Sequence, residues 1–133
     1  MSPRTRISAS IAVALLVAAT AAIATGGAAG SDVATASARA CDISGDQREL
    51  GASYVTSLKV EHATCTKARK VSKAFHGCRK DAGGANGKCD HAVLGFSCSE
   101  HRYDAVPGVQ YNSRVKCVKG GTHIVKQTYT QNT

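Results

Sequence analysis

Six cysteines are the strongest constraint on what this chain can fold into, because all of them follow residue 40 of 133. An even number of cysteines in a short exported domain is typical of a disulfide framework. Bulky apolar residues are few, with no Trp and two Phe, so a hydrophobic core alone is marginal here. We therefore predict three disulfides, each stabilising by about 2–4 kcal/mol, among Cys41, Cys65, Cys78, Cys89, Cys98 and Cys117.

The first 40 residues have the composition of an export signal followed by a spacer. Arg4 and Arg6 precede an apolar run at residues 11–24, and residues 26–40 are rich in Ala, Gly and Ser. The run is shorter than the roughly 20 residues of a membrane-spanning helix. We predict a signal peptide cleaved between about Ala24 and Cys41, an extracellular location, and one small domain over residues 41–133.

Cys41 directly after the spacer raises the alternative of a lipid-modified N-terminal cysteine. Residues 38–40 (A-R-A) lack the leucine that such signals usually carry, and they place a charge beside the cleavage point. The even cysteine count also requires Cys41 as a disulfide partner. A simple secretory signal is therefore favoured.

Residues 64–78 carry the clearest helical period of the chain. Apolar residues recur at steps of three and four, which places them on one helix face, at Cys65, Ala68, Val71, Phe75 and Cys78. Thr64 is suited to cap the first turn, and Gly77 is suited to end the helix.

Alternating or β-branched segments predict four strands around this helix. They cover residues 54–61, 92–98, 109–118 and 122–130, whereas the polar segment 99–108 with Pro107 is expected to be a loop. This order predicts an α+β fold in which one helix packs on a mostly antiparallel four-stranded sheet, in the order β-α-β-β-β.

One disulfide pairing follows from the loop that it would close. Cys78 and Cys89 flank the Gly- and Asn-rich residues 81–88, so a local bridge between them is expected. The other four cysteines are then expected to join the N-terminal segment and the helix start to the strands that carry Cys98 and Cys117.

Three short motifs resemble a group of small secreted actinobacterial proteins. They are T-C-x-x-A-R-K-V at residues 64–71, G-F-x-C at 95–98 and R-V-K-C-x-x-G at 114–120, and the similarity covers about residues 55–129. The resemblance implies the same fold and export. Because the group has no assigned activity, it implies no functional residues. The resemblance implies a simpler arrangement of four cysteines, to which Cys78 and Cys89 look like an added pair.

Histidines near cysteines raise the question of a metal site, because zinc binds thiolate and imidazole ligands. His76, His91 and His101 each lie within three residues of a cysteine, but no paired C-x-x-C motif is present. Exported thiols are normally oxidised to disulfides. The sequence therefore favours neither a metal nor another cofactor.

Catalysis is the next candidate, because histidine follows an acid at Glu61-His62, Asp90-His91 and Glu100-His101. Neighbours in a strand point to opposite faces, which separates an acid from the adjacent histidine. No G-x-S-x-G nucleophile motif is present. A small secreted hydrolase or nuclease using His101 or His91, with Arg114 on the phosphate, is the alternative hypothesis.

Charge supports a binding role instead. From Cys41 onward there are 14 Lys and Arg against 8 Asp and Glu. The predicted helix and its end carry six of these cations, which predicts weak affinity for polyanions, at Lys67, Arg69, Lys70, Lys73, Arg79 and Lys80. No aromatic residues alternate with them, so specific nucleic-acid recognition by base stacking is not expected.

The sequence thus favours a non-enzymatic secreted binding module. One version is a hydrolase inhibitor that makes contact through residues 81–88 or 99–108, since rigid cross-linked loops suit preorganised binding. The other is a protein associated with an anionic polymer or with the cell wall.

Overall fold

The computed structural model describes residues 37–133. The predicted signal peptide, most of the spacer and the earlier cleavage candidates lie outside the described residues. The elements are β1 (Arg39–Ala40), β2 (Tyr54–Glu61), α1 (Cys65–Asp81), the short 3-10 helix η1 (Gly84–Asn86), β3 (Ser97–Val106), β4 (Gln110–Lys119) and β5 (His123–Asn132). Within this part of the chain, no helix has the length and apolarity needed to cross a membrane.

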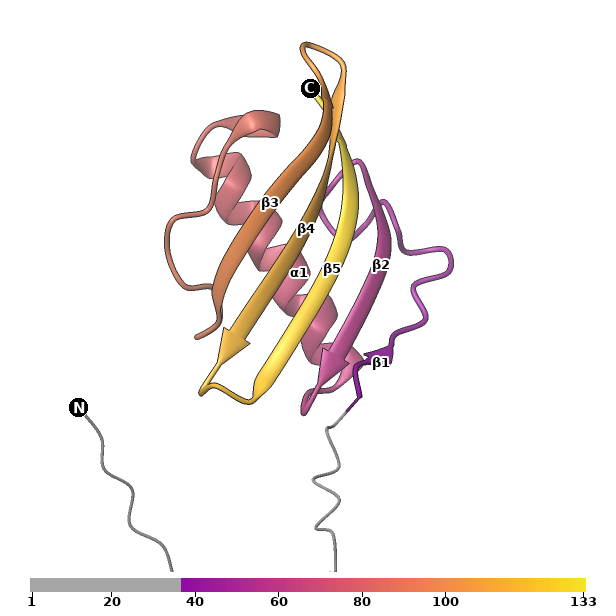
Figure 1. The fold of residues 1–133 in the computed structure, drawn as a ribbon, viewed down its shortest axis with the longest axis vertical. Helices are drawn as coiled ribbons and strands as arrows, with labels where there is room; N and C mark the ends of the chain where they lie inside the picture. The colour runs from indigo at the N-terminus through magenta and orange to yellow at the C-terminus, as the bar shows by residue number, and fades with distance from the viewer. Residues whose placement is uncertain (1–36) are drawn as a thin grey trace, which may run out of the picture. The chain divides into compact units, whose positions relative to one another are not determined.

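The five strands form one antiparallel sheet in the order β1-β2-β5-β4-β3, and α1 lies against one of its faces (Figure 1). The predicted α+β fold is confirmed, but the prediction of four strands is wrong. The additional strand is β1, in which Ala40 pairs with Lys59. It was missed because its two residues end the Ala-rich spacer and show no strand pattern of their own.

The second predicted strand, expected at residues 92–98, lies further along the chain as β3. Residues 99–108 were predicted to be a loop, yet β3 runs over Ser97–Val106 and pairs with β4 along most of its length. The apolar segment before it forms a tight turn instead, with a bridge between Val93 and Phe96 and positive φ at Leu94 and Gly95. Polar side chains that point inward concealed the strand.

Helix α1 begins as predicted and ends later. Thr64 is extended (φ −90°, ψ 153°), and its hydroxyl accepts a hydrogen bond from the Lys67 N–H at 3.1 Å. Gly77 does not end the helix, which continues to Asp81 before Gly83 and Gly84 turn the chain at positive φ. A single glycine inside a helix is tolerated when tertiary packing holds both sides of it.

The cap at Thr64 gives the first testable prediction. Thr64→Val keeps the side-chain shape and removes the accepting oxygen, so it should lower the free energy of unfolding by about 1 kcal/mol. Thr64→Ser retains the oxygen and serves as the matched control. Urea denaturation of both variants measures the difference, and equal losses would show that the cap contributes nothing.

Three disulfides are present, and the described residues contain no free cysteine. Cys78 is bonded to Cys89, which is the pair expected from the intervening loop. The expectation for the other four is wrong, because Cys41 is bonded to Cys65 and Cys98 to Cys117. The N-terminal segment is thus tied to the start of α1, whereas Cys98 and Cys117 are register partners on β3 and β4.

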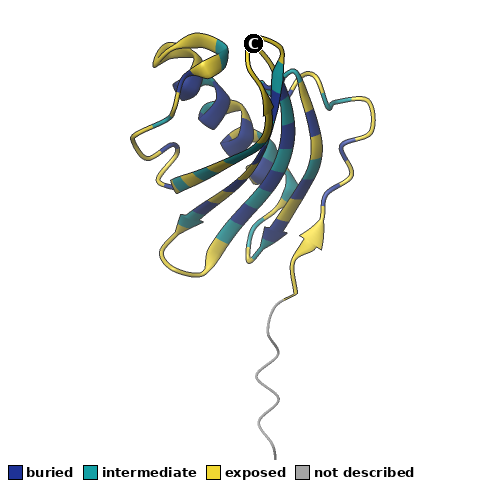
Figure 2. Ribbon diagram, turned by 45° about the horizontal axis from the view of Figure 1, so that its top comes forward, coloured by how far each residue is buried: buried dark blue, intermediate teal, exposed yellow. Residues whose placement is uncertain are grey.

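The core lies between α1 and the sheet, and burial alternates along the strands (Figure 2). Its centre consists of buried apolar side chains from α1, β2, β4 and β5, namely Ala68, Val71, Phe75, Val55, Leu58, Val60, Val115, Val125 and Tyr129. No described element covers the opposite face of the sheet, which faces the viewer in Figure 1. That open face is therefore available to a partner.

Candidate functional site

The open face of the sheet, meaning the outward-pointing residues of β2, β3, β4 and β5, carries a row of lysines. Lys126 on β5 is the register partner both of Lys59 on β2 and of Lys116 on β4. Three ammonium-bearing side chains therefore stand side by side across three adjacent strands. Strands in a sheet are about 4.8 Å apart, so the row spans about 10 Å at the backbone. Like charges directly opposite one another destabilise a sheet.

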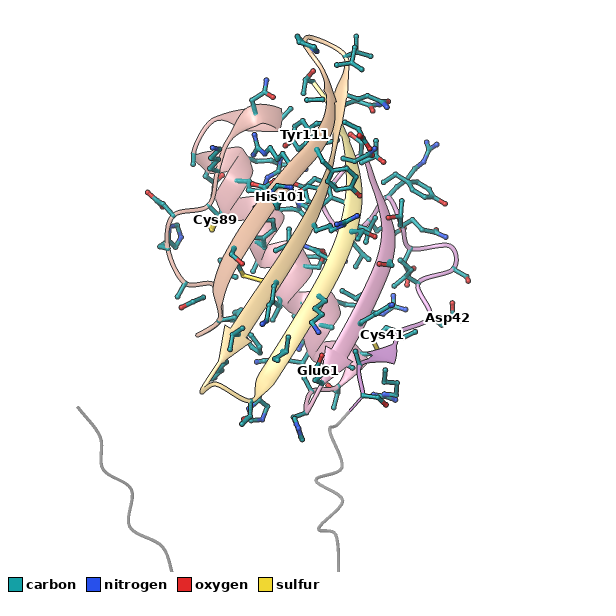
Figure 3. All side chains as sticks on the ribbon, in the orientation of Figure 1. Cys41, Asp42, Glu61, Cys89, His101 and Tyr111 are labelled. Carbon is teal, nitrogen blue, oxygen red and sulfur yellow. A yellow bond between two sulfur atoms is a disulfide. The ribbon has the colours of Figure 1, made fainter. Side chains whose placement is uncertain are left out.

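Acidic groups on this face are scarce. Among the regularly paired residues of the four strands, Glu61 is the acid that points to this face, and it lies at the end of β2 (labelled in Figure 3); the exposed Asp104 lies in the irregular part of β3. Lys126 Nζ donates to Glu61 Oε1 at 2.5 Å. That hydrogen bond lowers the pKa of Glu61, against the smaller opposing effect of burial, and the positive charge of Lys116 adds to it. Lys126 is thus paired with Glu61, and the open face remains basic through the exposed Lys59, Lys116 and Arg114.

An aromatic and cationic cluster continues the basic surface toward β3. The ring of His101 stacks on that of Tyr103, with centroids 6.4 Å apart and planes at 15°. The guanidinium of Arg114, the register partner of His101, lies 4.8 Å from the Tyr103 ring centroid. Cation–π contact of this kind holds the arginine in place while its N–H groups stay exposed. Arg114 thereby adds a fixed cation beside the lysine row.

The inward-pointing residues of β3 belong to a buried network on the other face. Glu100 accepts hydrogen bonds from Arg102 at 3.0 and 3.1 Å and from the Tyr129 hydroxyl, and it lies 3.6 Å from Arg79 Nε. Burial acts to raise the pKa of Glu100, but the bonds from Arg102 and Tyr129 outweigh it and hold the pKa below its ordinary value. Burial, and then the Glu100 carboxylate, raise the pKa of Tyr129.

Arg79 is the centre of this network and is fully buried. Its guanidinium donates to His76 Nδ1 at 2.9 Å, to the Ala85 carbonyl at 2.8 Å and to the Tyr111 hydroxyl. Since arginine donates only, His76 accepts at Nδ1 and is neutral in this arrangement. Burial, with a smaller effect of the Arg79 charge, lowers the pKa of His76 to about 3.

The predicted polyanion-binding set on α1 is only partly accessible. The inclusion of Arg79 is wrong because its side chain points into the core. Arg69 is bonded to the Asp46 carboxylate and to the Asp42 carbonyl, so its charge is already paired. The remaining four are exposed, namely Lys67, Lys70, Lys73 and Lys80.

Glu100 and the catalytic candidate His101 point to opposite faces of β3. Glu100 points toward α1, whereas His101 points to the open face, as expected for neighbours in a strand. A hollow of about 410 Å³ at the edge of the sheet is lined by both residues together with Lys88, Cys89 and Arg102. The Glu100 carboxylate already accepts hydrogen bonds from Arg102 and Tyr129, and it is therefore a poor general base.

Asp90 and His91 do form an acid–histidine pair, because they lie in a loop rather than in a strand. His91 Nδ1 is 3.0 Å from Asp90 Oδ1, and the two side chains are 68% and 87% exposed. The hydrogen bond from His91 lowers the pKa of Asp90. His91 also lies near the sulfurs of Cys78 and Cys89, but these form a disulfide and are therefore not thiolate ligands for a metal.

No protein-family model, curated protein or solved structure matches this chain. The resemblance to secreted actinobacterial proteins therefore remains a prediction, and the functional inference depends on the geometry of the surface alone.

Proposed function

We propose that this protein is an extracellular, non-enzymatic binding module for linear phosphodiester polymers, and that the open face of the sheet is its binding surface. The observation that carries the proposal is the register of Lys59, Lys126 and Lys116 across three strands. An anionic chain that crosses the strands would meet the three ammonium groups in succession. Its charge would also relieve the repulsion among them.

The scaffold supports this role because it fixes the cations in advance. The lysines stand on paired strands rather than on loops, and a disulfide joins neighbouring β3 to β4. A preorganised surface loses little conformational entropy when it binds. The proposal thus requires no rearrangement of the backbone.

The composition of the face favours recognition of the polymer backbone rather than of bases. Tyr103 is occupied by His101 and Arg114, and Tyr54 stands at the far end of the sheet. Base-stacking proteins instead present successive free aromatic rings along their groove. A polymer such as a glycerol-phosphate chain supplies the required charge without needing such rings.

Removing the lysine row should weaken polymer binding well beyond the effect of net charge. The triple variant Lys59→Gln, Lys116→Gln and Lys126→Gln should bind a linear glycerol-phosphate polymer about tenfold or more weakly. The slope of log K against log salt concentration should become shallower by roughly 2 to 3, since each lost contact contributes about 0.7–0.9. Fluorescence anisotropy with labelled polymer at several salt concentrations measures both.

The matched control removes the same charge from exposed positions of α1, in Lys70→Gln, Lys73→Gln and Lys80→Gln. This variant changes only the long-range electrostatic attraction of the protein, so we expect only a small loss of affinity for the polymer. An equal or larger loss would place binding on α1, as the charge of the helix alone first indicated, and would overturn the proposal. Equally tight binding of a carboxylate polymer with the same charge spacing would remove the assignment to phosphodiesters.

A hydrolase remains the alternative, and the hydrogen bond between Asp90 and His91 is the observation in its favour. Turnover of a phosphodiester or peptide substrate that is abolished by His91→Ala, but not by His101→Ala, would support it. The absence of turnover on such substrates would leave only the binding role. An inhibitory role makes a separate prediction, namely loss of activity in a target hydrolase when this protein is added.

A further inference from the structure

A second basic site lies at the end of the sheet where α1 begins. It is a hollow of about 430 Å³ into which four basic side chains converge, namely His62, Lys67, Lys119 and His123. They come from the segment after β2, the first turn of α1, the end of β4 and the start of β5. The volume falls within the range typical of sites for small molecules. None of the four belongs to the lysine row.

The strand register explains why three of these residues meet. Lys119 and His123 are paired at the end of the β4–β5 hairpin, whose turn is formed by Gly120 and Gly121 at positive φ. Glu61 pairs with Ile124, so His62 follows β2 at the level of His123. Three adjacent strand ends therefore deliver one basic residue each, and Lys67 reaches the same hollow from α1.

The floor of the hollow is apolar. Phe96, 1% exposed, and Ala63 line it beneath the basic groups. Lys119 Nζ lies 6.0 Å from the centroid of the Phe96 ring. A Cβ atom at Gly95 would stand only 3.2 Å from that Nζ, so glycine leaves space for the lysine side chain there. A partly apolar lining edged by cations suits a ligand that is both apolar and anionic.

No carboxylate neutralises the hollow, since none is among its lining residues. Glu61, the acid next to His62, is bonded to Lys126 on the open face. The first turn of α1 also carries no acidic residue. The positive potential is therefore uncompensated, and the ammonium and imidazole groups supply charged or polar N–H donors.

We propose that this hollow binds small phosphomonoesters that carry a flat apolar group. The phosphate would lie among the four basic side chains, and the apolar group would lie against the apolar part of the lining at Ala63 and Phe96. Lysine and histidine donors that line one hollow match the three terminal oxygens of a phosphate, while the apolar part of the lining discriminates against free phosphate. This site is distinct from the polymer-binding face in both its residues and its ligand.

Phenyl phosphate is the probe, measured by isothermal titration against the full chain. Lys67→Gln with Lys119→Gln should raise its Kd about tenfold or more, because both variants remove an ammonium donor from the phosphate. The control, Lys70→Gln with Lys73→Gln, removes the same charge outside the hollow and should change the Kd less than about twofold. Inorganic phosphate should bind more weakly than phenyl phosphate.

Three outcomes would overturn the inference. The absence of saturable binding of phenyl phosphate by the unmodified protein would remove the site. An equal loss in the control would show unspecific attraction by net charge. Equal affinity for inorganic phosphate would show that the apolar floor does not contribute. Because the polymer test uses other residues and another ligand, either proposal can fail without the other.

Discussion

Replacing Arg79 with methionine is expected to lower the free energy of unfolding by about 3–5 kcal/mol. The guanidinium is fully buried and bonds to groups from α1, the η1 segment and β4, and it lies close to Glu100 on β3. Methionine fills most of the volume but leaves the His76 and Tyr111 polar atoms without this donor and removes one compensating charge from Glu100. Urea denaturation at neutral pH measures the loss.

The neighbouring Lys80 provides the matched control for Arg79. Lys80 is exposed, so Lys80→Met should change the free energy of unfolding by less than about 0.5 kcal/mol. The double variant Arg79→Met with Glu100→Gln should lose less than the sum of the two single losses, because the two groups interact. A loss below about 1 kcal/mol for Arg79→Met would show that the buried guanidinium is not a central support of the fold.

The protein should lose stability steadily as the pH falls from 6.5, because of His76. The ordinary pKa of 6.5 falls to about 3 in the folded state, so between these values the unfolded chain binds more protons. The free energy of unfolding should therefore fall by about 1.4 kcal/mol per pH unit below 6.5, and on the order of 2 kcal/mol by pH 5. Denaturation curves at half-unit steps from pH 7.5 to 4.5 measure this slope.

The pH range ends at 4.5 because protonation of Glu100 would add a second loss of stability below that value. The pKa of Glu100 is lowered from 4.5, so its stabilising contribution is present above 4.5 and is lost as the pH falls further. His76→Asn, whose side-chain oxygen can still accept from Arg79, should remove the slope between pH 6.5 and 4.5. His101→Asn, at an exposed position, is the control. A slope that persists in His76→Asn would assign the pH dependence to other groups.

The elements that could be predicted from the sequence are those whose pattern is local. Strand β2 matches the prediction because its side chains alternate between buried and exposed. The start of α1 matches because the capping residue Thr64 precedes apolar residues at helical spacing. Strand β3 was placed wrongly because its inward positions hold Glu100 and Arg102. Inward-pointing charges look like a loop until their partners on other elements are known.

Arg79 was misplaced although the sequence contained a signal for it. Counting from Ala68, steps of four, three and four reach Ser72, Phe75 and then Arg79, so the arginine continues a buried stripe of α1. Its charge was taken as evidence of exposure. The partners that make its burial tolerable come from the distant segments η1, β3 and β4, and a helical period cannot indicate them.

The candidate binding surfaces were beyond the sequence for a different reason. Lys59, Lys116 and Lys126 are each unremarkable in an alternating strand. Their alignment depends on the pairing of β2 with β5. These two strands are far apart in the sequence, since α1, β3 and β4 lie between them. A count of charges instead favours α1, where six of the 14 cations after Cys41 lie close together in sequence.

The disulfide connectivity has a consequence for how the protein matures. The six cysteines pair in order along the chain, first with second, third with fourth and fifth with sixth, so the three covalent loops follow one another without overlapping. In a chain that crosses a membrane N-terminus first, each cysteine would meet its correct partner as the next thiol to emerge. If the chain is exported as predicted, oxidation could keep pace with translocation, and no native bond would have to wait for the C-terminal strand.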